Sequence, residues 1–285
     1  MNKLIKIGLP SKGRLKDESL KIFKRNNLTI KDSKRNYLSE IKNFSLNEIV
    51  FSHAREIVER LASNSLDVGI SGYDLLKESL PGIQKNIQVF SRLKFGFANL
   101  IVAVPNAWID VQTIADLEEI SFEFKDKNTG KLRVATKYPN LTNDFLLSKG
   151  LTQYKIVNSL GSTEIYPFTD QSEIITDITS SGATLKANNL RILKDGNILK
   201  SSACILVSKK SLRDKVKKKV ITGLLKKLIF VWVTWGLHSH QVLVLLTFSM
   251  DDIETTLQSI TLLSVSEKQT TLNIVSVKPL PQNTH

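Results

Sequence analysis

The 285-residue sequence contains one cysteine, Cys204. A single thiol excludes a disulfide framework within the chain and is typical of proteins from a reducing compartment. The basic start of the chain, residues 1–15, has an apolar run that is too short and too broken for a signal peptide. We therefore expect a cytoplasmic protein.

The sequence also lacks an uninterrupted apolar run long enough to span a membrane. The longest candidate, residues 228–250, is broken by the polar segment His238-Ser239-His240-Gln241. We expect two strands joined at this segment, and no membrane partner. His238 and His240 are a weak metal-site candidate because no third ligand suggests itself.

Acidic residues are scarce relative to basic ones: 27 Asp and Glu against 40 Lys and Arg give a net charge of +13. Such a field suits nucleic acids, and equally small polyanions such as nucleotides and diphosphates. The sequence shows no zinc-ligand spacing, RNP motif or basic helix with interleaved aromatics, so a nucleic-acid partner is not favoured. The alternative would depend on the basic segment 209–227, which holds nine Lys and Arg against Asp214 and is otherwise interpreted as a solvated helix.

Apolar runs and helical periodicities alternate through the first 210 residues, which predicts an α/β fold with mostly parallel sheets. The predicted strands include 4–10, 66–72, 97–105, 131–136, 154–158 and 203–209. The predicted helices include 17–27, capped by Asp17, and 52–64, 110–118, 140–150 and 185–192. Residues 172–178 are compatible with a helix or a strand.

The stretch TDITSSGATLKANNL, residues 176–190, combines an acid with a run of small donors. Gly182 lets the backbone approach a phosphate closely, and Ser180, Ser181 and Thr184 add hydroxyl donors around Ala183. A carboxylate beside a phosphate cradle is useful when the ligand also carries a sugar. Asp177, and Glu173 one helical turn earlier, are therefore candidates for holding a ribose diol. The alternative is a capped turn with no ligand.

Three further turns follow predicted strands, where open α/β sheets bind ligands. SKGRL places Lys12, Gly13 and Arg14 after the first strand, and DVGISGYDLL places Asp67, Gly72 and Asp74 at a strand and turn. LGSTE sets Glu164 beside a Gly/Ser turn. Each is also compatible with an ordinary solvated loop or tight turn.

Several segments, taken in order along residues 3 to 210, resemble the ATP phosphoribosyltransferase family of histidine biosynthesis. These segments are LPSKGRL, DVGISGYDLL, RLKFGFANLIVAVP, RVATKYPNLTNDFL, SLGSTE, DITSSGATLKANNL and SSACILVSK. DITSSGATLKANNL is the most specific of them, and Ser181 stands where many relatives carry threonine.

The resemblance implies a two-lobed α/β fold like that of periplasmic solute-binding proteins, with the active site in the cleft between the lobes. Lobe I is expected to hold 1–103 with 185–210, and lobe II to hold 104–184. Residues 211–285 would form a basic helix and a tail that does not resemble the family's histidine-binding regulatory domain. The tail is either an unrelated extension or the product of a misread reading frame in the coding sequence.

The resemblance also implies the chemistry: N1 of ATP attacks C1 of phosphoribosyl pyrophosphate, pyrophosphate leaves, and Mg²⁺ is required. Glu173 and Asp177 would orient the ribose, and Glu164 with Ser180 to Thr184 would bind the donor. Lys12, Gly13, Arg14, Asp67 and Gly72 would bind ATP. The chain would form a homo-oligomer, or join a regulatory subunit resembling histidyl-tRNA synthetase, as short-form members do. The competing hypothesis is a non-catalytic solute- or nucleotide-binding protein of the same fold.

Overall fold

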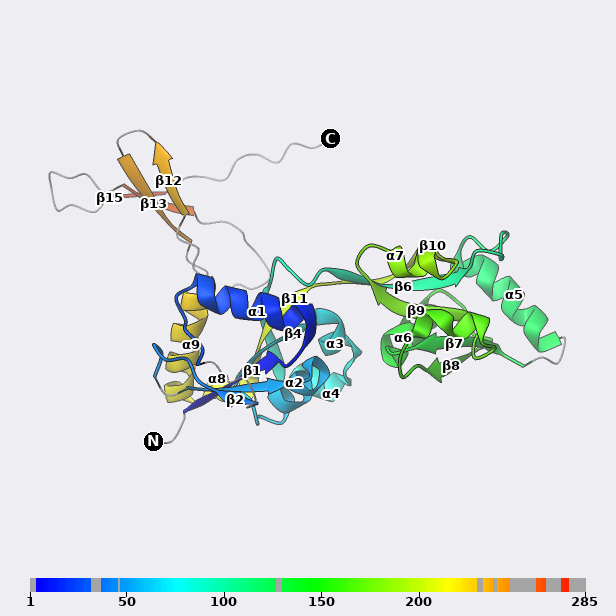
Figure 1. Cartoon of the computed structure of the whole chain (residues 1–285), viewed down its shortest axis with the longest axis horizontal. Helices are drawn as coiled ribbons and strands as arrows, with labels where there is room; N and C mark the ends of the chain where they lie inside the picture. Colours follow the sequence, from blue (N-terminus) through cyan, green and yellow to red (C-terminus); the bar gives the residue numbers. More distant parts are fainter. Residues whose placement is uncertain are drawn as a thin grey trace. The chain divides into compact units, whose positions relative to one another are not determined.

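The computed structural model describes residues 4–31, 37–45, 47–126, 130–229, 233–237, 240–246, 260–264 and 273–276 (Figure 1). Residues 1–221 form one compact unit and residues 222–285 form a second. Each unit is described by itself.

The first sheet has six strands in the order β2-β3-β1-β4-β11-β5. Its strands are β1 (Ile5–Pro10), β2 (Leu38–Ser39), β3 (Asn47–Ser52), β4 (Val68–Gly72), β5 (Ile87–Arg92) and β11 (Ala203–Ser208). The helices between them are α1 (Gly13–Arg25), α2 (Ala54–Ala62), α3 (Tyr73–Glu78) and α4 (Pro81–Lys85). Buried side chains of α2 pack on this sheet, including Ile57 and Leu61, because the helix places them one turn apart on one face.

The second sheet has five strands in the order β10-β6-β9-β7-β8. Its strands are β6 (Ala98–Pro105), β7 (Leu132–Thr136), β8 (Tyr154–Asn158), β9 (Ile174–Thr179) and β10 (Leu190–Ser201). The remaining elements are α5 (Ile114–Asp126), α6 (Pro139–Ser148), the 3₁₀ helix η1 (Thr163–Phe168) and α7 (Ala183–Ala187). Alternate residues of β6 point to opposite faces, so Val102 and Val104 enter one core cluster while Ile101 and Ala103 enter another.

The two sheets confirm the expected two-lobed α/β architecture, and below we call the part built on the first sheet lobe I and the part built on the second lobe II. The chain crosses between the lobes at residues 93–97 and at Ser202. These two connections run side by side, because Leu93 N donates to Ala203 O (2.7 Å) and Ala203 N donates to Phe95 O (3.0 Å). Backbone hydrogen bonds therefore hold the two connections between the lobes together.

The sheet membership differs from the lobe boundaries expected from the sequence. β6 and β10 pair with each other in the second sheet, although 98–103 and 185–201 were expected in lobe I. The sheets are also mixed rather than mostly parallel, since β11 runs antiparallel to β4 and β5, and β9 and β10 run antiparallel to β6. Of the helix expected over 185–192, residues 185–187 lie in α7, while residues 190–192 belong instead to β10, the long antiparallel partner of β6.

Two other local predictions change. Helix α1 begins at Gly13 with Lys12 at its N-cap, so Asp17 lies inside the helix and is not the cap. Residues 174–179 form strand β9, which removes the helical alternative for this segment. β5 was not anticipated.

The basic segment 209–227 is helical as expected, in α8 (Lys209–Arg213) and α9 (Lys215–Ile229). The second unit contains a four-stranded antiparallel sheet in the order β12-β13-β14-β15. Its strands are β12 (Val233–Leu237), β13 (His240–Leu246), β14 (Ile260–Ser264) and β15 (Asn273–Ser276). β12 and β13 confirm the two strands expected around residues 238–241, and Leu237 pairs with His240. His238 lies outside the described residues.

Candidate functional site

The carboxyl ends of the parallel strands bring several predicted residues to one edge of each sheet. In lobe I, β1 and β4 are parallel, and they end at Ser11–Arg14 and at Gly72. In lobe II, β7, β8 and β9 are parallel and end at Lys137, Ser159 and Ser180. Ligands of open α/β sheets bind at such edges.

A pocket of about 320 Å³ joins these two edges. Its walls come from lobe I, from the crossing segment and from the end of β9. The lining residues are Arg14, Leu15, Gly72, Asp74, Leu75, Phe95, Gly96, Phe97, Ala98, Ile178, Ser180 and Ala203. Arg14, Gly72 and Ser180, three of the residues predicted from sequence, therefore meet around one space.

The loop after β9 has the conformation that a backbone cradle needs. Gly182 has φ +73°, a left-handed conformation that favours glycine, and an added Cβ there would meet nothing within 4 Å. Thr179 stabilises the turn, because Gly182 N donates to Thr179 Oγ1 at 2.9 Å. Ser180, Ser181, Ala183 and Thr184 are exposed, and Ala183 N donates to Ser181 Oγ at 3.4 Å. α7 is a single short turn of helix, so backbone and hydroxyl groups, rather than a helix dipole, must supply the attraction.

Asp177 lies three residues before this loop, on β9. Burial is the main cause that raises the pKa of its carboxyl above the ordinary aspartate value, and the nearby charge of Glu164 adds to the rise. Donation from Ile178 N (2.7 Å), the positive charge of Lys137 and the hydroxyl of Thr163 act in the opposite direction. The charge of Glu164 therefore acts on Asp177, whereas the sequence paired Asp177 with Glu173.

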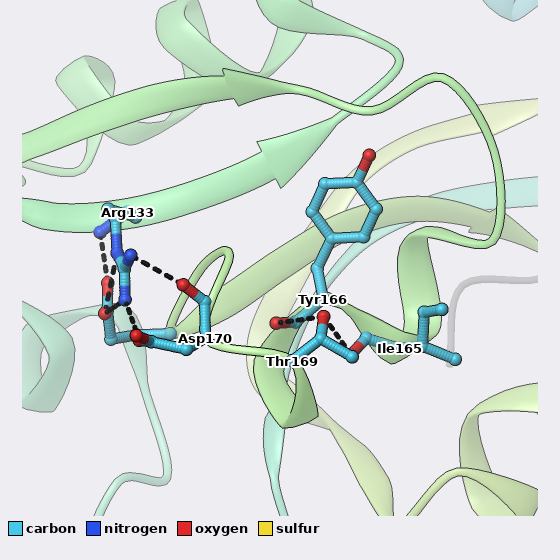
Figure 2. A network of polar contacts seen from close by, with 6 residues as sticks. Arg133, Ile165, Tyr166, Thr169 and Asp170 are labelled. Carbon is cyan, nitrogen blue, oxygen red and sulfur yellow. Dashed lines mark hydrogen bonds and ion pairs between the residues drawn. The ribbon is translucent and has the colours of Figure 1, made fainter.

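Glu173 lies elsewhere. Four residues of extended strand separate it from Asp177, about 13 Å along β9. Its carboxylate accepts from Arg133 N (2.6 Å), Nε (2.9 Å) and Nη2 (2.6 Å), and the same guanidinium donates to the carbonyl and the carboxylate of Asp170 (Figure 2). Glu173 thus fixes the turn between η1 and β9, and its oxygens are already used.

The hydroxyl of Thr169 donates to the carbonyls of Ile165 and Tyr166 in the same turn (Figure 2).

We expect Glu173→Gln to lower the free energy of unfolding by about 1–3 kcal/mol, because the guanidinium of Arg133 loses its charged partner. Affinity for a sugar phosphate should change little, unlike the effect of changing Asp177. Thermal unfolding measures the stability and ligand titration of the same preparation measures the affinity. A loss of affinity without a loss of stability would show that Glu173 binds the ligand.

Asp67 is also separated from the pocket. It stands before β4, at the opposite end of the strand from Gly72, about 16 Å away. Its buried carboxylate accepts from Lys6 N (2.7 Å), Ser211 Oγ (2.6 Å) and Lys217 Nζ (2.8 Å). The expected ATP contact at Asp67 is therefore replaced by a structural role that attaches the helices after β11 to the first sheet.

Lys12 and Gly13 remain at the mouth of the site, because they begin α1 beside Arg14 and are exposed. Sequence reasoning missed Lys137, Thr163 and Thr179, whose groups act on Asp177 or on the loop. The position of Lys137, directly after strand β7, was the available signal. Within the described residues no cluster of three or more His, Cys, Asp or Glu side chains forms a metal site, and none of the helices described is long and apolar enough to cross a bilayer.

Two α/β lobes, each built on its own sheet and joined by two adjacent crossings, define a protein of the two-lobed α/β class. A family model described as HisG, ATP phosphoribosyltransferase, matches residues 53–229. The chain belongs to the ATP phosphoribosyltransferase family, which makes it a pentosyltransferase of histidine biosynthesis.

Similar proteins agree with this assignment. An ATP phosphoribosyltransferase of Chelativorans sp. is 42% identical over 209 residues, covering 72% of this chain and 91% of the relative. One of Mesorhizobium japonicum is 40% identical over 226 residues, covering 75% and 97%. Among solved structures, the ATP phosphoribosyl transferase (HisG:HisZ) complex from Thermotoga maritima superposes with a TM-score of 0.62 at 26% identity, covering 79% of this chain and 96% of that one.

Proposed function

We propose that the loop Ser180–Thr184 binds the 5-phosphate of phosphoribosyl pyrophosphate while Asp177 accepts hydrogen bonds from its ribose hydroxyls. The observation that carries this assignment is the left-handed Gly182 with open space above it, three residues from the end of the strand that holds Asp177. Glu164 lies beside Asp177 and faces the same ligand. Glu173, which the sequence had placed with Asp177, has no part in this proposal because Arg133 occupies it.

The ATP side of the site belongs to lobe I in this proposal. Arg14 and Gly72 line the pocket, and Lys12 and Gly13 begin the helix at its mouth. Cations at this edge offset the charges of two polyphosphates brought together. N1 of adenine forms the new bond to C1 of the donor as the bond from C1 to the diphosphate oxygen breaks, and the diphosphate leaves with the electron pair. Positioning and charge stabilisation supply the catalysis, since N1 itself is the nucleophile.

Two carboxylates of this site fit a Mg²⁺ ion that is held together with the substrate phosphates. Mg²⁺ is usually held by one or two carboxylates together with substrate phosphates. Glu164 and Asp177 are the carboxylates that would hold it, and the absence of a larger ligand cluster among the described residues agrees with a metal that arrives with the diphosphate. When bound, the ion would neutralise charge on the leaving diphosphate.

Assembly and location follow the same resemblance. The solved relative is a HisG:HisZ complex, and we propose that this chain likewise works with a regulatory subunit, expected to resemble histidyl-tRNA synthetase, or as a homo-oligomer. The free, buried Cys204 supports a cytoplasmic location.

The experiment that tests the function is pyrophosphate release from phosphoribosyl pyrophosphate. We expect release only when ATP and Mg²⁺ are both present, with the product carrying the ribose on N1 of adenine. Binding of both substrates without turnover, in the presence of a regulatory subunit, would favour the alternative of a non-catalytic nucleotide-binding protein. Native mass with and without that subunit measures the assembly.

A further inference from the structure

The N-terminus of helix α6, in lobe II, is capped by a side chain from lobe I. Tyr138 occupies the N-cap position but makes no side-chain cap bond. Instead Glu78, at the end of α3, accepts from Asn140 N and Leu141 N, both at 3.0 Å, and its own carbonyl accepts from Asn140 Nδ2 at 2.8 Å. Glu78 is 2% exposed, and burial raises the pKa of its carboxyl. A buried carboxylate on the free N–H groups of another lobe's helix is a specific contact.

A second buried contact joins the same two elements. Tyr138 OH donates to Asp74 Oδ2 at 2.9 Å, and Ser201 Oγ donates to Asp74 Oδ1 at 2.5 Å. Asp74 N in turn donates to Ser201 Oγ at 3.0 Å. Asp74 belongs to α3 and also lines the pocket, while Ser201 ends β10 just before the chain crosses back to lobe I. The Tyr138 hydroxyl therefore connects lobe II to a carboxylate at the wall of the site.

The lobe II side of this contact is rigidly connected to the strand of Asp177. Tyr138 N donates to Thr136 Oγ1 at 2.9 Å, and the hydroxyls of Thr136, Thr142 and Thr176 form a closed, fully buried triangle with sides of 3.2, 2.6 and 2.6 Å. Thr176 directly precedes Asp177 on β9. A displacement of Tyr138 relative to lobe I would thus carry β9 and its loop with it.

We propose that Asp74, Glu78 and Tyr138 form an interlobe latch. The latch sets the spacing between the loop Ser180–Thr184 of lobe II and the edge of lobe I that holds Arg14 and Gly72. This inference rests on the proposed function, because it assumes that the ligands bind between those edges. The three side chains are positioning residues: they hold the two halves of the site at the distance at which N1 and C1 meet. A further contact across the lobes, Arg55 Nη2 donating to the carbonyl of Lys137 at 3.0 Å, supports the same arrangement.

The test uses Tyr138→Phe, which removes one hydroxyl and keeps the ring. Tyr154→Phe is a matched control, because Tyr154 OH donates to Asn143 Oδ1 (2.7 Å) within lobe II only. Labels at Lys85→Cys in lobe I and Lys155→Cys in lobe II, both exposed positions, report the interlobe distance without ligand. The native Cys204 is fully buried and its pKa is raised to about 11, so it should not compete for a thiol reagent at neutral pH.

We expect Tyr138→Phe to broaden or shift the interlobe distance distribution and to weaken donor binding and kcat/KM by about 5- to 10-fold, the effect of losing one hydrogen bond of ordinary net strength. Tyr154→Phe should leave both measurements near those of the unchanged chain. Glu78→Gln, which keeps the side-chain size but replaces one acceptor by a donor, should move both readouts in the same direction as Tyr138→Phe.

The latch is wrong if folded Tyr138→Phe and Glu78→Gln variants keep the original distance distribution. It is also wrong if the control Tyr154→Phe shifts the distance as much as they do. Failure of the proposed function gives a different result, since the unchanged chain would then bind no phosphoribosyl pyrophosphate while the distance measurement, made without ligand, still decides the latch.

Discussion

Gly182→Val is expected to abolish measurable binding of phosphoribosyl pyrophosphate. Gly182 has φ +73°, where a β-branched residue is strained, and its Cβ position opens onto empty space beside the loop donors. The valine methyl groups would occupy that space and keep the phosphate away from the backbone amides. Losing two charge-assisted hydrogen bonds costs roughly 3 kcal/mol or more, about a 100-fold loss of affinity. Isothermal titration with the donor measures it.

Gly130→Val is the matched control for this experiment. Gly130 has φ +98° and also has nothing within 4 Å of an added Cβ, so its replacement introduces the same kind of backbone strain. It precedes β7, whose carboxyl end and not its amino end faces the site. We expect Gly130→Val to lower stability in the way Gly182→Val does while the donor affinity stays unchanged. Normal donor affinity in a folded Gly182→Val protein would show that this loop does not bind the donor.

The left-handed turn at Gly182 could be predicted from the sequence because its signal is local. Asp177, Ser180 and Gly182 lie within six residues, and the loop chemistry depends on backbone freedom and small donors that a short segment displays by itself. The same holds for β1, β4 and β11, whose apolar runs are typical of buried strands.

Features that depend on pairing across the chain were not predictable in the same way. The segment 190–201 becomes a strand because it pairs with β6, and this tertiary partner outweighs the helix expected to continue to residue 192. Asp67 looked like a ligand residue by its motif, yet the direction of β4 places it at the far end of the sheet. Asp74 and Tyr138 are 64 residues apart in sequence, so nothing local indicates that they meet.

Strand direction also explains why only one of the two candidate acids for the ribose remains. In a helix, Glu173 and Asp177 would lie one turn apart, close enough to share one diol. In β9 the same spacing puts Glu173 at the amino end, beside Arg133, and Asp177 near the carboxyl end, beside the loop. Secondary structure therefore decides which acid can be proposed for binding: the strand separates Asp177, the proposed binding residue, from Glu173, which has a structural role.

Asp177→Asn is expected to lower kcat/KM by about 100-fold or more, because the amide has one acceptor oxygen instead of two and carries no charge to stabilise the positive charge that develops on the sugar. Stability should respond in the opposite direction. Burial raises the native pKa of Asp177, so its stabilising contribution is present at low pH and is lost as pH rises through that value. At neutral pH the ionised carboxylate is therefore a cost to the fold, and the neutral asparagine should raise the melting temperature or leave it unchanged.

This pairing of lost activity with retained or increased stability is the signature that distinguishes Asp177 from Glu173. The pH dependence of donor binding from pH 4 to 8 adds a second test. In the unchanged chain, binding should weaken on the acid side at a pH above the ordinary aspartate pKa, and this weakening should disappear in Asp177→Asn. A destabilised Asp177→Asn protein with near-normal kcat/KM would mean that the buried carboxylate is held for the fold. The ribose would then be oriented by another group at this edge, with Glu164 the next candidate because its charge already acts at the same place.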